Sequence, residues 1–170
     1  MSKVMLNLIP TKHREDFDEI VGALSAELGP RFAYSLNNWC GIGTRPYPLS
    51  VWEMFLAKTD DQVVGICSFY RQIDDRPIRM WVGWIGVLPQ FRRQKIGSEM
   101  LSRIENMMLL KGARESWVYA DEDDKAAQTF YIARGYKRVG TLGGIGSVQA
   151  AATEMSTVFM KSLISAIEEL

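Results

Sequence analysis

The chain has 170 residues, of which 20 are Lys or Arg and 20 are Asp or Glu, so its formal net charge is zero. This length favours a single domain over residues 1–170, and the neutral charge argues against a nucleic-acid-binding protein, because such proteins usually carry a basic excess. No apolar run approaches the ~20 residues needed to span a bilayer, which argues against a membrane protein.

The amino-terminal residues lack the long apolar segment and the small-residue cleavage site of a secretory signal. The chain has two cysteines, Cys40 and Cys67, which are too few for a disulfide framework. We therefore expect a protein of the reducing cytoplasm.

The first half of the chain predicts one helix among several strands. Apolar residues at helical spacing, including Phe17, Ile20 and Leu24, indicate a helix over residues 15–28. Residues 31–49 contain several glycines and prolines and predict an irregular connection, of the long kind that often carries function. Short apolar runs bounded by turn residues predict strands at 4–9, 52–58, 62–71 and 78–87.

The second half of the chain predicts two helices between shorter strands. Ile96, Met100 and Ile104 begin an apolar helical face that ends near Gly112. A second helix is expected over residues 124–134, and strands over 115–120, 136–140 and 157–163. This order of elements predicts a mixed α/β (α+β) fold, with helices flanking one central and mostly antiparallel sheet.

The junction between the strand at 78–87 and the next helix is the most informative segment. Cations at a helix start oppose the helix dipole, so their presence there makes sense if an anion binds at that point. Free backbone N–H groups at a helix start also bind phosphate. The sequence therefore predicts a loop that holds a phosphate or pyrophosphate, built from Arg92, Arg93, Lys95, Gly97 and Ser98.

This segment resembles the acetyl-CoA-binding loop of the GCN5-related N-acetyltransferases, whose pattern is Arg/Gln-x-x-Gly-x-Gly/Ala. Lys95 stands where the family usually has its first glycine, and Gly97 matches the second. The matching residues in order are Arg92, Arg93, Gln94, Lys95, Ile96 and Gly97.

Residues 124–136 resemble a second motif of that family, roughly Asn-x-x-Ala-x-x-Phe/Leu-Tyr-x-x-x-Gly-Phe. Asp124 replaces the usual Asn, Tyr136 replaces the usual Phe, and Tyr131 falls at the tyrosine position. The two motifs occur in the family's order, and the resemblance covers about residues 52–163.

The resemblance implies an enzyme that transfers an acetyl group from acetyl-CoA directly to a primary amine of a small-molecule or peptide acceptor, and by analogy a homodimer. It implies that the loop, including Ile96 and Ser98, binds the pyrophosphate. The backbone of Ile85 and Val87 would bind the pantetheine arm, and Asp124 would contact that arm. Glycines in this strand, Gly83 and Gly86, would let a ligand approach the main chain.

Tyr131 is the candidate general acid. The expelled thiolate has a conjugate thiol pKa of ~8.5, against ~10 for tyrosine, and a positioned tyrosine could donate a hydrogen bond or a proton to it. On pattern alone, Tyr131 equally suits a core position beside Phe130, and Asp124 equally suits a helix N-cap. The general base stays unassigned, because the strand before the loop has no carboxylate; Asp121 and Glu122 are the nearest candidates.

Two rival functions remain open. A non-catalytic acyl-CoA-binding or sensor domain would keep the loop and lack a base. A nucleotide-binding protein is the weaker rival, because the glycine-rich residues 143–147 lack the Lys-Ser/Thr of a P-loop and read instead as a link between the last two strands. No group of residues has metal-ligand spacing, so no metal is expected.

The acceptor site is expected to involve residues 31–49 and an aromatic wall. Such a wall would suit a cationic or planar acceptor, although core packing explains each aromatic residue as well. The candidates for the wall are Tyr34, Trp39, Trp81 and Trp84.

Overall fold

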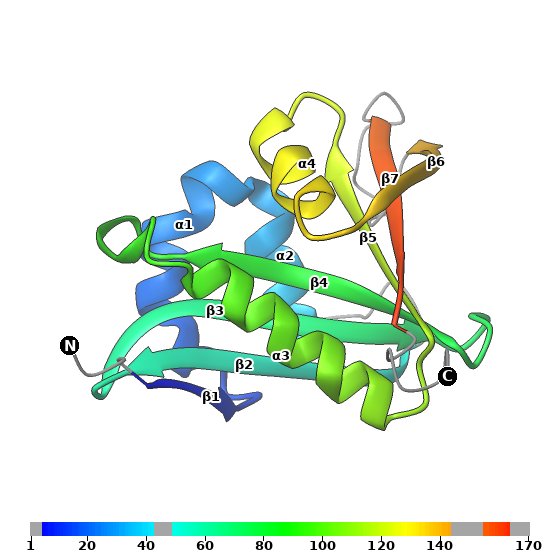
Figure 1. Ribbon diagram of the computed structural model, residues 1–170. Helices are drawn as coiled ribbons and strands as arrows, with labels where there is room; N and C mark the ends of the chain where they lie inside the picture. The colour runs from blue at the N-terminus through cyan, green and yellow to red at the C-terminus, as the bar shows by residue number, and fades with distance from the viewer. Residues whose placement is uncertain (1–4, 43–48, 144–154, 164–170) are drawn as a thin grey trace.

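A seven-stranded sheet forms the frame of the molecule (Figure 1). It is seen in a computed structural model that describes residues 5–42, 49–143 and 155–163. The spatial order of the strands is β1-β2-β3-β4-β5-β7-β6. Their bounds are β1 Leu6–Pro10, β2 Leu49–Thr59, β3 Gln62–Gln72, β4 Arg79–Val87, β5 Glu115–Asp121, β6 Lys137–Gly143 and β7 Met155–Ser162.

All neighbouring strands pair antiparallel except β4 and β5, which pair parallel. Short turns join β2 to β3 and β3 to β4, as expected for antiparallel hairpins, whereas the parallel pair needs the long crossover through α3 (Ile96–Leu110). The predicted mixed and mostly antiparallel sheet is therefore confirmed.

Helices cover both faces of the sheet (Figure 1). One face carries α1 (Asp18–Leu28) and α2 (Pro30–Trp39), and the other carries α3 and α4 (Lys125–Ile132). Short 3-10 turns precede α1 and α3, at Arg14–Phe17 and Pro89–Phe91.

The core is divided by the sheet, because successive strand residues point to opposite faces. In β2, Phe55 and Ala57 pack in the cluster under α3, whereas Met54 and Leu56 pack under α1 and α2. Both faces of the central strands are therefore buried, which explains their nearly continuous apolar sequence.

The prediction of an irregular segment over residues 31–49 was wrong for residues 31–39, which belong to α2. Gly29 has a φ of 77°, which ends α1, and Pro30 occupies the first turn of the next helix. Proline suits that position, since its fixed φ is helical and its missing N–H would have no partner there. Phe32 and Leu36, four residues apart, are fully buried on one face of α2. Residues 43–48 lie outside the described part of the chain.

The remaining predicted elements are found with bounds shifted by a few residues. The largest extensions are at β2, which begins at Leu49, and at β6, which runs to Gly143. The link predicted at 143–147 lies almost wholly outside the described residues.

Strand β4 carries a β-bulge at its middle. Cys67 pairs with Ile85 and Phe69 pairs with Val82, so Ser68 alone faces two residues of β4. The Ser68 hydroxyl accepts a hydrogen bond from the Trp84 N–H at 2.7 Å, which satisfies a backbone group that the bulge takes out of the ladder. The bulge turns the second half of β4 relative to the first.

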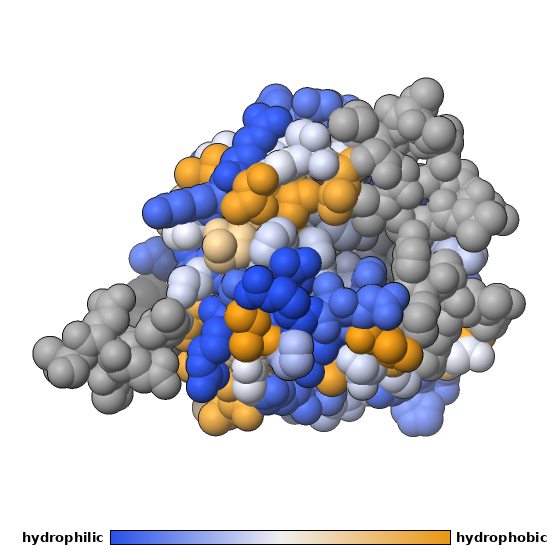
Figure 2. All heavy atoms as spheres, turned by 90° about the vertical axis from the view of Figure 1, so that its right-hand side faces the viewer, coloured by the Kyte–Doolittle hydropathy of each residue, from blue (hydrophilic) through white to orange (hydrophobic). Residues whose placement is uncertain are grey.

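The surface alternates between charged and apolar side chains. Figure 2 shows the end of the molecule where the turn between β3 and β4 lies, and hydrophilic side chains there separate the apolar patches. Within the described residues, no helix is both long and apolar enough to cross a membrane.

Cys67 gives the fold a sensitivity to alkaline pH. Burial in β3 raises the pKa of its thiol from an ordinary value of 9.0 to about 12. Above pH 9 the unfolded chain loses this proton while the folded chain keeps it, so stability is complete below that pH and falls as pH rises.

We predict that the free energy of unfolding falls more steeply between pH 8 and 10 in the wild type than in Cys67→Ala, by roughly 1 kcal/mol. Urea unfolding at the two pH values measures the difference. Cys40→Ala is the control, because Cys40 is only half-buried and this variant should keep most of the wild-type slope. Equal slopes in wild type and Cys67→Ala would contradict the prediction.

Candidate functional site

The site begins where β4 and β5 separate. Their pairing consists of three residue pairs, which end at Trp81 and Trp117. Beyond these pairs β4 continues beside β3, while β5 leads towards α4 (Figure 1). Two adjoining cavities border the separated strands, and six residues line both: Glu27, Leu28, Ile85, Asp124, Ala127 and Tyr131.

The larger cavity, of about 600 Å³, lies between the edge of β4 and the facing ends of α3 and α4. It brings together residues of both sequence motifs, which are separated by about thirty positions in the chain. Gln94, an exposed loop residue, does not line it. The predicted site residues that do line it are Ile85, Val87, Arg92, Arg93, Lys95, Ile96, Gly97, Ser98, Asp124 and Tyr131.

The loop before α3 has the backbone conformation that the family's glycine position favours. Arg93 and Lys95 both have a φ of 63°, in the left-handed region. This conformation costs a residue with a side chain roughly 1–2 kcal/mol. Lys95 therefore preserves the shape of the loop at a cost in backbone energy.

The first turn of α3 presents backbone donors to the cavity. The Glu99 N–H donates to the Lys95 carbonyl, which makes the first bond of the helix. The N–H groups of Ile96, Gly97 and Ser98 precede that bond, so they have no partner within the helix. Exposed Arg93 and Lys95 add positive charge beside them. This end of the cavity suits an anion.

Arg92 has a different role from the other two cations. Its guanidinium donates to the Val87 carbonyl at 3.0 Å and to the Glu27 carboxylate of α1 at 2.6 Å. A ligand that used the Val87 carbonyl would compete with Arg92 for it.

Tyr131 lies at the meeting point of the two cavities and is 7% exposed. Its ring meets Phe130 and Tyr136 edge to face, at centroid distances of 5.2 and 5.5 Å. Burial raises the pKa of the Tyr131 phenol above its ordinary value of 10.0, and the nearby Asp124 carboxylate raises it further. The phenol therefore keeps its proton at neutral pH.

Asp124 caps α4, as one of the two sequence interpretations expected. Its carboxylate accepts a hydrogen bond from the Ala127 N–H at 2.9 Å. The same residue borders both cavities, so the cap leaves it beside the site.

Gly83 and Gly86, predicted to admit a ligand to the main chain, line the smaller and the larger cavity respectively, and packing inside the protein also requires glycine at both positions. A Cβ added at Gly86 would lie 2.7 Å from the Leu24 side chain, and one at Gly83 would meet Ser68 and Trp39. Both glycines make room for the protein's own side chains.

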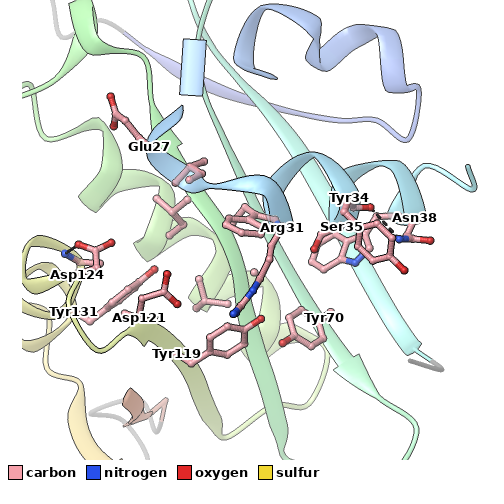
Figure 3. A pocket seen from close by; sticks show the side chains of 18 of the residues that line it. Glu27, Arg31, Tyr34, Ser35, Asn38, Tyr70, Tyr119, Asp121, Asp124 and Tyr131 are labelled. Atoms are coloured by element: carbon pink, nitrogen blue, oxygen red, sulfur yellow. Dashed lines mark hydrogen bonds between the residues drawn. The ribbon is translucent and has the colours of Figure 1, made fainter. Parts of the chain in front are cut away.

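The smaller cavity lies between α2, the second half of β4 and the end of β5 (Figure 3). Three of the four predicted wall residues, Tyr34, Trp39 and Trp84, line it. Trp81 does not: its ring packs against Tyr70, Trp117 and Tyr119 in the core. Of the two carboxylates considered as base, Asp121 lines this cavity, whereas Glu122 does not.

No metal centre is seen in this region. Among the residues that the structure describes, no group of three or more His, Cys, Asp or Glu side chains could hold a metal ion.

Comparison with protein families identifies the chain. The sequence model of the acetyltransferase (GNAT) family matches residues 18–136, a range that contains every residue lining the larger cavity. The chain belongs to the GNAT acetyltransferase family.

Part of this GNAT chain also resembles an aminoalkylphosphonate N-acetyltransferase from Salmonella typhimurium, with 34% identity over 86 residues. The match covers 49% of the chain and 55% of the relative, so it spans about half the length of either protein.

Solved GNAT structures have the same fold. A ribosomal-protein-S18-alanine N-acetyltransferase from Escherichia coli has a TM-score of 0.67 at 15% identity, over 98% of this chain and 99% of the other. A GNAT acetyltransferase from Elizabethkingia anophelis with acetyl-CoA bound has a TM-score of 0.64 at 13% identity, over 92% and 97%. At these identities the likeness concerns the fold.

The structure brings a further cation, Arg134, to the larger cavity, and the sequence did not indicate this residue. Arg134 follows Phe130 by one helical turn, lies 3.7 Å from its ring centroid and donates to its carbonyl. Its Nε also donates to Ser98 Oγ at 3.0 Å, which joins α4 to the start of α3. Residues four apart on a helix lie on the same face, so the spacing between Phe130 and Arg134 could have indicated that these two side chains meet.

On the other face, Glu27 was missed, and Arg31 was included only as the first residue of the segment 31–49 that was expected at the acceptor site. Glu27 of α1 and Arg31 of α2 line the smaller cavity. Glu27 lies in a predicted helix and Arg31 in a segment predicted to be irregular, so no pattern placed either beside the loop.

We predict that Asp124→Ala lowers the free energy of unfolding by about 1 kcal/mol, because the first turn of α4 loses its cap. Asp124→Asn is the matched variant: its side-chain oxygen can still accept from Ala127, so it should stay close to wild type. Thermal and urea unfolding measure both variants. Equal stability of the Ala variant and the wild type would show that the cap is dispensable.

Proposed function

We propose that this protein transfers an acetyl group from acetyl-CoA to the primary amine of an acceptor. GNAT membership supports acyl transfer. One observation carries the finer proposal: the loop before α3, the free edge of β4 and Tyr131 border a single cavity. Its volume of about 600 Å³ lies within the usual range of small-molecule sites.

The residues at the loop fit the diphosphate of CoA. Backbone N–H groups at the start of α3 would bind phosphate oxygens, and Arg93, Lys95 and Arg134 would add charge-assisted hydrogen bonds. The β4 edge at Ile85 and Val87 offers backbone groups for the amides of the pantetheine arm, although a ligand would have to displace Arg92 to use the Val87 carbonyl. When bound, acetyl-CoA supplies the activated thioester.

We predict that saturating acetyl-CoA raises the unfolding midpoint, whereas ATP with Mg²⁺ does not. A ligand at ~100 times its Kd stabilises by about 2.7 kcal/mol, which corresponds to roughly 5–10 °C for a domain of this size. Differential scanning fluorimetry measures the shift. A shift with ATP–Mg²⁺ alone would replace acetyl-CoA with a nucleotide as the ligand.

Tyr131 would give the leaving sulfur a hydrogen bond or a proton. The raised pKa keeps the Tyr131 phenol protonated. Tyr131 lines both the larger cavity, which would hold acetyl-CoA, and the smaller cavity, which would hold the acceptor. The new N–C bond forms as the C–S bond breaks. Tyr131 would pass its proton to the sulfur and regain one from the acylated nitrogen, which loses a proton as it becomes the amide.

The acceptor must also lose a proton before its nitrogen attacks. Asp121 is exposed at the end of β5 and borders the smaller cavity, close to Tyr131 in Figure 3. Asp121 would take the ammonium proton directly or through water. The carboxylate of Glu27 is less suited, because it already pairs with Arg92.

We predict that Tyr131→Phe lowers kcat by about 10²- to 10⁴-fold, the usual contribution of a general acid, with little change in CoA affinity. Release of the CoA thiol measures kcat, and calorimetry measures affinity. Unchanged turnover would exclude the acid role.

Tyr136→Phe is the matched control. The Tyr136 hydroxyl bonds to Ser116 at 2.6 Å and to Glu105 at 2.8 Å in the core, and it lines neither cavity. The control should therefore lose about 1–3 kcal/mol of stability, because its buried partners lose their hydrogen bond, while keeping its turnover.

The rival is a domain that binds acyl-CoA without catalysis. It predicts stabilisation by acetyl-CoA and no thiol release with any amine. An acceptor screen separates the two, and the aminoalkylphosphonates on which the Salmonella typhimurium relative acts belong in that screen.

A further inference from the structure

The smaller cavity is lined by side chains of both charges. The three carboxylates that line it belong to Glu27, Asp121 and Asp124, and two of these residues also line the larger cavity. The one cation among its described lining residues, Arg31, extends from α2 (Figure 3). Asp121 lies between Tyr131 and Arg31 in this view.

The Arg31 side chain forms part of the cavity lining. Arg31 is the second residue of α2 and is half-buried. Its Nη2 atom is shielded from solvent. Its guanidinium reaches across the cavity towards Tyr119 of β5 (Figure 3). A guanidinium presents a planar fork of donors that matches carboxylate and phosphate oxygens.

Neutral hydroxyl groups accompany Arg31. Tyr34 and Ser35 come from α2, Tyr70 from β3 and Tyr119 from β5, and all four line the same cavity. Hydroxyls can donate to an oxyanion without adding charge. A cation with several hydroxyls is a suitable setting for an anionic group with two or three oxygens.

The carboxylates of the cavity suit a group of the opposite charge. Asp124 already accepts the cap bond from Ala127, and Glu27 pairs with Arg92. Asp121 is the remaining carboxylate of the three, and among the described residues its side chain has no hydrogen-bond or ion-pair partner. An ammonium group beside Tyr131 would therefore face Asp121.

We propose that the acceptor is a short amine that carries an oxyanion, and that Arg31 binds the oxyanion while the amine lies beside Asp121 and Tyr131. This assignment rests on the proposed acetyl transfer, whose acceptor class it names. Arg31 is thus a specificity-determining residue, and the oxyanion is a phosphonate or a carboxylate. The volume of about 200 Å³ suits an acceptor of a few heavy atoms.

The test compares three amines that share an aminoethyl group: 2-aminoethylphosphonate, β-alanine and propylamine. Each is titrated by calorimetry into CoA-saturated protein, and thiol release with acetyl-CoA gives kcat and KM. The wild type should bind at least one anionic amine about 10- to 100-fold more tightly than propylamine, the range of a charged hydrogen bond. The preferred anionic amine identifies the oxyanion.

Arg31→Gln should remove this preference through KM, with kcat and the response to propylamine nearly unchanged. Arg138→Gln is the matched control, because Arg138 is exposed on β6 and lines neither cavity. Retained stabilisation by CoA shows that Arg31→Gln is folded.

Two failures can be told apart. If CoA binds but all three amines bind equally, or if Arg31→Gln keeps the preference, the Arg31 assignment is wrong and acetyl transfer stands. If CoA neither binds nor releases thiol with any amine, the proposed function fails, and titration of the CoA-free protein still tests whether Arg31 selects anionic amines.

Discussion

The separation of β4 from β5 is the constraint on which the site depends. The parallel pairing of β4 with β5 ends at Trp81 and Trp117, whereas β3 stays paired with β4 on both sides of the bulge at Ser68. Backbone groups on the free edge of β4 must find other partners. One of them, the Val87 carbonyl, is met by Arg92, and the neighbouring positions border the larger cavity.

The aromatic cluster at the junction keeps the strands in this arrangement. Trp81 packs against Trp117 and Tyr119 of β5 and stacks on Tyr70 of β3, and its indole N–H donates to Asp75 at 3.0 Å. Large rings at the point of divergence fill the space that continued pairing would otherwise occupy. The aromatic residues that appeared suited to a ligand thus divide between this support and the cavity wall.

Charge is distributed along the site in a consistent order. Cations gather at the start of α3, Glu27 and Asp124 border both cavities, and Asp121 and Arg31 line the smaller one. Opposite charges within one cavity favour a ligand with the complementary order of charges, and like charges disfavour the reverse orientation. The left-handed residues of the loop, Arg93 and Lys95, are the backbone cost of this arrangement.

The sequence by itself determined the elements and the two motifs. Apolar periodicity, turn residues and the cations before Gly97 are local features, so they predicted the sheet class, the loop and Tyr131 in its helix. One segment was misinterpreted: residues 31–49 were predicted to be irregular, whereas Pro30 starts α2, since proline is favoured in a first turn.

The tertiary structure alone decided which residues share a cavity. Glu27, Arg31 and Arg134 come to the site from α1, α2 and the turn after α4, and no spacing in the chain encodes the distance between those elements. The same holds for Gly83 and Gly86, whose neighbours Trp39 and Leu24 are far away in sequence. Local propensity determines each helix and strand. Packing across the sheet determines which side chains face the site, and that packing depends on contacts between segments distant in the chain.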